Sequence, residues 1–132
     1  MAYMKYLITL LCFTYLFGFN AWAQTDTTKQ ITTADFSKPV PANTISAEVG
    51  HTVAVCDTVV DYRVVSEALT LLNLGGRYPN QRITIAIKGP QIKPALMKGK
   101  SVCFYGEVTL FKNKPEMVVT QPVQVMDIKK YQ

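Results

Sequence analysis

Apolar and polar residues alternate along several short stretches of this 132-residue chain, and this alternation constrains its fold more than any other feature. Ile83, Ile85 and Ile87 are separated by polar or small residues, a period of two that indicates a strand with one apolar and one mostly polar face. Leu69–Leu74 is apolar on both parities, which favours a central strand. Pro122 predicts a bend or an edge, because proline donates no ladder hydrogen bond. The predicted strands are Val53–Val59, Leu69–Leu74, Ile83–Ile87, Val102–Leu110 and Met117–Val125.

The connections between these strands narrow the choice of fold. Gly75–Gln81 and Lys112–Pro115 contain turn-forming residues and predict two hairpins. The connection Gly89–Gly99 is longer and leaves room for one short helical turn around Ile92–Met97. Five short strands with one longer connection after the third are typical of a small Greek-key barrel. The sequence therefore predicts an all-β, five-stranded OB-fold with a short helical turn between strands three and four.

The first 23 residues have the pattern of a secretory signal peptide. Lys5 precedes an apolar stretch, Tyr6–Phe19, which is followed by the small-residue site Ala21-Trp22-Ala23. The alternative is a membrane anchor, but a bilayer span needs about 20 apolar residues, and this stretch is shorter. We expect cleavage after Ala23, no lipid anchor, and an exported protein that is periplasmic or secreted.

The next segment, residues 24–44, contains six Thr and little apolar material, so it predicts a flexible tether. The folded domain is expected over residues 45–127, with a short tail at residues 128–132. Removal of residues 1–23 takes away only Lys5, so 13 basic residues remain against nine acidic ones and the net charge is +4. This charge fits an anionic partner and also ordinary solubility.

Three stretches resemble a known family: VGHTVAVCDTVV, LLNLGGRYPNQRITIAI and KGKSVCFYGEVTLFKNKPEMVVTQPVQV. They are similar to bacterial OB-fold domains of exported proteins, some of which lie beside nuclease domains. The resemblance covers residues 49–126 and implies binding of nucleic acid, by analogy with tRNA-anticodon-binding barrels. Asp57 stands where the family has Gly, and the helix expected before the first strand is reduced to Ser46-Ala47-Glu48.

Cys56 and Cys103 are the two cysteines that remain after cleavage. Export into an oxidising compartment favours a disulfide between them. In an OB-fold the first and fourth strands are antiparallel neighbours, and strand parity points both cysteines outward. The alternative is a pair of reduced, half-buried cysteines that pack as small apolar residues.

No catalytic constellation is evident in the sequence. His51 is the only histidine, and no Ser, Cys or carboxylate is placed to form a triad with it. The carboxylates are scattered without the spacing of metal ligands. We therefore expect no enzyme activity, no metal and no cofactor.

The candidate binding surface is the outer face of strands two and three with the adjoining loops. Single-strand binders combine cations with aromatic side chains on which bases stack, and Tyr62, Tyr78 and Tyr105 are the candidate platforms. The expected ligand is single-stranded nucleic acid or an oligosaccharide. Two alternatives are an envelope module that binds a protein or small ligand, and a plain solvated surface. The candidate ligand-binding residues are Arg77, Tyr78, Arg82, Lys88, Tyr62, Arg63, Lys112 and Lys114.

Overall fold

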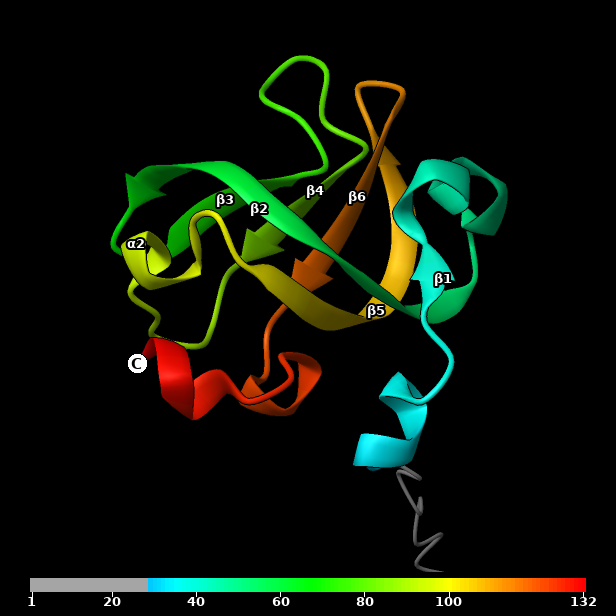
Figure 1. Cartoon of the computed structure of the whole chain (residues 1–132), viewed down its shortest axis with the longest axis horizontal. Coiled ribbons are helices and arrows are strands. Elements are labelled where there is room, and N and C mark those ends of the chain that lie inside the picture. Colours follow the sequence, from blue (N-terminus) through cyan, green and yellow to red (C-terminus); the bar gives the residue numbers. More distant parts are fainter. Residues whose placement is uncertain (1–28) are drawn as a thin grey trace, which may run out of the picture.

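The computed structural model describes residues 29–132 (Figure 1). The predicted signal peptide and the first part of the predicted tether, residues 24–28, lie outside the described residues. Within residues 29–132, no helix is long and apolar enough to span a membrane. The strands are β1 (Val40–Pro41), β2 (Thr52–Ser66), β3 (Leu69–Leu74), β4 (Ile83–Ile87), β5 (Ser101–Phe111) and β6 (Lys114–Val119). The helices are η1 (Thr33–Phe36), η2 (Ala42–Glu48), α2 (Pro94–Met97), η3 (Pro122–Gln124) and η4 (Ile128–Tyr131), all 3-10 helices except α2.

The protein is mostly β, with one six-stranded mixed sheet in the order β1-β2-β3-β4-β6-β5. β2 also pairs with β5, so this strand has partners on both sides. The β1–β2 and β4–β6 pairs are parallel, and the other pairs are antiparallel. All five predicted strands are present, and β3 is central as expected. The structure adds the two-residue strand β1.

β2 pairs with both β3 and β5 because it is long and its antiparallel partner changes partway along the strand. Its first half, Thr52–Thr58, pairs with β5, and the register with β3 begins at Val59. A register shift between Val59 and Asp61 marks a β-bulge, which bends the strand and increases its twist. This bend lets one strand take part in both halves of the sheet.

The core lies on the inner face of the sheet. Ile83, Ile85 and Ile87 are buried there, as the alternation predicts. The other face of β4 is also buried, which corrects the prediction of a solvated polar face: Thr84 and Ala86 are 9% and 2% exposed. Met97 on α2, which falls within the predicted helical turn, is fully buried against the same core.

The last predicted strand is too long. β6 ends at Val119, and η3 begins at Pro122, where the sequence predicts a bend. The Gln124 side chain stabilises the new direction: its Oε1 accepts hydrogen bonds from the backbone N–H groups of Thr120 and Gln121. The predicted C-terminal tail is the helix η4, whose Tyr131 is buried in the core.

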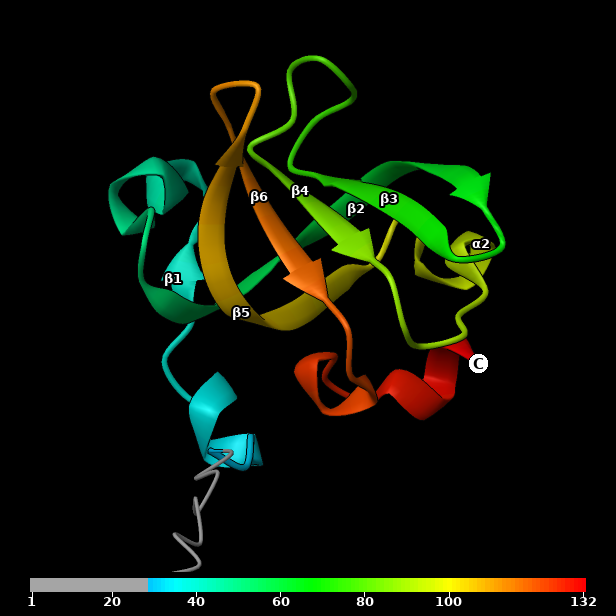
Figure 2. The same ribbon diagram turned by 180° about the vertical axis from the view of Figure 1, so that it is seen from behind.

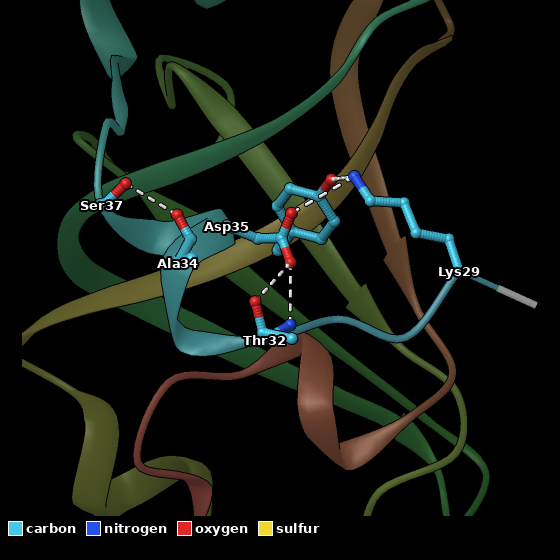
Figure 3. Close-up of polar contacts among 6 residues, drawn as sticks. Lys29, Thr32, Ala34, Asp35 and Ser37 are labelled. Atoms are coloured by element: carbon cyan, nitrogen blue, oxygen red, sulfur yellow. Dashed lines mark hydrogen bonds and ion pairs between the residues drawn. The ribbon is translucent and has the colours of Figure 1, made fainter.

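The predicted tether is wrong for the part that the structure describes. Phe36 on η1 is buried, and its ring centroid lies 6.0 Å from that of Tyr105. Lys29 Nζ donates to the Tyr105 hydroxyl at 2.9 Å and lies 3.2 Å from Asp35 Oδ1 (Figure 3). The Thr32 backbone N–H donates to Asp35 and holds the pKa of that carboxyl below its usual value. The segment packs against β2 and β5 because it shields the apolar face of these two strands from solvent.

The folded region therefore begins well before residue 45. η2 spans seven residues, so the helix before β2 is longer than the expected Ser46–Glu48 remnant. Ala42 and Ile45 on η2 are buried in the main core.

The predicted Cys56–Cys103 disulfide is present. The two cysteines are directly opposite each other in the β2–β5 ladder, with an S–S distance of 2.03 Å. Cys103 also packs against the cluster of Phe36, Ala54 and Tyr105. The bond therefore links the two strands under the N-terminal segment.

We expect the double variant Cys56→Ala/Cys103→Ala to keep the fold and to lose stability. The disulfide joins residues 47 apart in sequence, and chain entropy for such a loop gives an upper value of about 4 kcal/mol. Chemical denaturation, with circular dichroism as the signal, measures this loss. An unchanged midpoint, or two free thiols per wild-type chain purified without reductant, would contradict the role of the bond.

Candidate functional site

Two connecting segments lie side by side at one end of the sheet (Figures 1 and 2). One is the β3–β4 connection, residues 75–82, and the other is the β5–β6 hairpin. β4 and β6 are parallel neighbours, with Thr84 opposite Glu116, so both strands start at the same end. The segments that precede these strands must therefore meet.

A lysine and a tyrosine join the two segments. Lys114 Nζ, at the start of β6, lies 5.7 Å from the centroid of the Tyr78 ring. The same Nζ donates a hydrogen bond to the Pro79 carbonyl. Tyr78 is 71% exposed, so most of the ring surface is open to solvent.

A second aromatic residue completes the cluster. Phe111, the last residue of β5, is opposite Lys114 in the β5–β6 ladder and is 56% exposed. Lys112 Nζ lies 5.5 Å from the centroid of the Phe111 ring. We call Arg77, Tyr78, Phe111, Lys112 and Lys114 the loop-end patch.

The conformation of the β3–β4 connection depends on its glycines. Gly75 has φ +74°, and a Cβ there would lie 2.6 Å from Asp57 Oδ2. A Cβ at Gly76 would lie 2.4 Å from the Asn80 backbone oxygen. Larger residues would force the loop away from β2 and change the position of Tyr78.

The structure separates the other predicted residues from this patch. Arg82 forms an ion pair with Asp57, with Nη1 3.2 Å from Oδ2, so its charge is compensated. Tyr62 packs against the core, and Arg63 is exposed on the second half of β2. Tyr105, expected to be an outward platform, is buried beneath Phe36.

Lys88 lies at the opposite end of β4. It lines a cavity of about 510 Å³ between the β2–β3 turn and the segment after β4. Glu67 and Gln91 line the same cavity. A five-residue strand is about 17 Å long, so Lys88 and Tyr78 do not form one contact site.

A row of polar residues crosses the outer face next to the loop-end patch. Asp61, Asn73, Thr84 and Glu116 are successive partners in the register from β2 to β6. Asn73 Nδ2 donates to Asp61 Oδ1 at 2.8 Å, and Thr84 Oγ1 donates to Asn73 Oδ1 at 3.2 Å. Alternation in β4 predicted a polar face, but not the alignment of polar residues across four strands, which depends on register.

Gln81 extends this row towards the loop. Its Nε2 donates to Thr84 Oγ1 at 3.0 Å. Its Oε1 is buried and has no hydrogen-bond partner among the described residues. A buried acceptor of this kind costs free energy unless a donor reaches it.

His51 is exposed, and its Nδ1 lies 3.2 Å from Glu48 Oε2. Within residues 29–132, no group of three or more His, Cys, Asp or Glu side chains is close enough to bind a metal ion. Comparison of the chain with family models and with curated proteins found no match.

Burial raises the pKa of the Glu116 carboxyl above its ordinary value of 4.5, and the charge of Lys88 partly opposes this effect. A raised folded-state pKa means that ionisation of Glu116 is less favourable in the folded chain than in the unfolded one. The contribution of Glu116 to stability therefore falls as pH rises from 4.5 through the folded-state pKa of this carboxyl.

We expect Glu116→Gln to melt at a higher temperature than the wild type near neutral pH. The difference should disappear below about pH 4, where the carboxyl is protonated in both states. Thermal melts at several pH values measure it, and Glu107→Gln, at an exposed position on β5, is the matched control. If Glu116→Gln still melts at a higher temperature than the wild type at acidic pH, ionisation of Glu116 is not the cause of the difference.

Proposed function

We propose that this chain is an exported OB-fold binding module, without enzyme activity, that binds single-stranded nucleic acid through the loop-end patch. The strand order supports the OB-fold. β2 pairs with β3 on one edge and with β5 on the other, so the pairings β2-β3-β4-β6-β5 return to β2. A closed ring of five strands with one helical connection is the arrangement of this Greek-key barrel.

The exposed Tyr78 ring beside Lys114 is the observation that carries the proposal. An exposed aromatic face accepts a stacked base, and stacking contributes roughly 1–3 kcal/mol per base. The adjacent ammonium group favours the phosphate of the same nucleotide. Tyr78 and Lys114 both fall within the stretches that resemble exported OB-fold domains.

The charges around Tyr78 support an anionic ligand. Arg77, Lys112 and Lys114 make no ion pair with any carboxylate of residues 29–132. Phosphate contacts by such side chains provide affinity that does not depend on sequence.

Export is supported by two independent features. The first 23 residues have the pattern of a signal peptide. The Cys56–Cys103 disulfide is typical of oxidising compartments. Intact-mass measurement of protein from the envelope fraction should give a chain that begins at Gln24.

We expect charge reversal in the patch to weaken binding of all single strands alike. Arg77→Glu/Lys112→Glu removes two phosphate contacts, so the slope of log affinity against log salt should fall by about 1.4 units for a single strand. Fluorescence anisotropy with a labelled oligonucleotide measures both quantities. Lys93→Glu/Lys129→Glu makes the same change in charge near the C-terminus, away from the patch, and should leave the slope unchanged.

Equal losses of oligonucleotide affinity in both double variants would show that binding depends only on the net charge of the protein. That result would contradict binding at the loop-end patch. Binding of a neutral oligosaccharide, independent of salt, would assign the patch to sugars. If the wild type shows no salt-dependent binding at micromolar concentrations, the nucleic-acid proposal is wrong. An envelope module that binds a protein or small ligand then takes its place.

A further inference from the structure

Phe111 lies on the same outer face of the sheet as Lys114. In the β5–β6 ladder, Thr109 is opposite Glu116 and Phe111 is opposite Lys114. Residues two apart on a strand share a face, so these four side chains lie together. Val108 and Met117, on the other parity, are fully buried in the core.

Lys114 lies between the two exposed rings. In the sheet order, β6 separates β4 from β5. Phe111 is on the β5 side of Lys114, and Tyr78, in the segment that leads into β4, is on the other side.

Each ring has its own cation. Lys112 is 5.5 Å from the Phe111 ring centroid, and Lys114 is 5.7 Å from that of Tyr78. The result is an alternating array: Tyr78, Lys114, Phe111, Lys112. A single strand presents the same alternation, since each unpaired base is joined to the next by a phosphate.

We infer that Phe111 is a second stacking platform, so the patch binds two successive unpaired bases of one strand with Lys114 between them. This inference rests on the proposed function and specifies its ligand. In a duplex, each base is stacked on its neighbours and paired, so its faces are not free for separated rings. The site should therefore select single strands over duplexes.

Leu110 provides a matched control. It is next to Phe111 and equally exposed, at 54%, but has the parity of the buried Val108 and so projects from the opposite face. A stacked base contacts Phe111 alone. A membrane or protein surface that covered the hairpin tip would contact both side chains.

Competition experiments test the two-base site. The probe is a labelled oligonucleotide of about ten thymidines, and the competitors are thymidine mono- and dinucleotides. We expect Phe111→Leu and Tyr78→Leu each to weaken probe binding about 5- to 150-fold, by a similar factor at about 50 and 200 mM salt. Leu110→Ala should bind as the wild type does. The dinucleotide should compete better than the mononucleotide against the wild type, and Phe111→Leu should remove this advantage.

The outcomes separate the inference from the function on which it rests. If the wild type and Phe111→Leu bind the probe equally, Phe111 is no platform, although the proposed function stands. If Leu110→Ala loses as much affinity for the probe as Phe111→Leu does, the ligand contacts both faces of the hairpin tip. That result would exclude stacking of a base on Phe111 as the source of the affinity. If the wild type binds no oligonucleotide but binds anionic vesicles, both the inference and the proposed function are wrong.

Discussion

The pairing of β2 with strands on both of its edges is the constraint on which the rest of the structure depends. Its first half pairs with β5 and its second half with β3, and the bulge between Val59 and Asp61 joins the two halves. β4 and β6 must then lie between β3 and β5. The branched and aliphatic side chains of all five strands meet on one inner face, and Met97 on α2 packs against them. The disulfide fixes the β2–β5 ladder at Cys56.

This strand order also positions the candidate site. Because β4 and β6 run parallel, the β3–β4 connection and the β5–β6 hairpin meet, and Lys114 reaches both Tyr78 and Pro79. Within the described N-terminal segment, η1 lies toward the opposite end of the sheet, whereas η2 lies beside the last part of β5 (Figures 1 and 2). A partner bound at the loop-end patch would therefore not compete with η1. The fold and the function are linked through one parallel strand pair.

Local patterns predicted most of the fold, and long-range contacts account for the rest. The period of two predicted β4, apolar residues on both parities predicted β3, and turn residues predicted both hairpins. The N-terminal segment was misread because its attachment depends on Phe36 meeting Tyr105, 69 residues later in the sequence. The same contact removed Tyr105 from the candidate platforms. Strand parity does not reveal the ion pair of Arg82 with Asp57, and Phe111 was missed because its exposure depends on how far the hairpin extends beyond the core.

The central claim is that the ends of the β3–β4 connection and the β5–β6 hairpin form one binding surface for a single strand. Nuclear magnetic resonance titration of the isotope-labelled protein with a short oligonucleotide tests it most directly. The account predicts that backbone amide shifts change at residues 76–82 and 110–116, with Tyr78 and Phe111 among the most affected. Residues 92–100 and 122–132 should remain unchanged. Shifts that instead cluster around Lys88 and the β2–β3 turn, or that are absent from the loop-end patch, would contradict it.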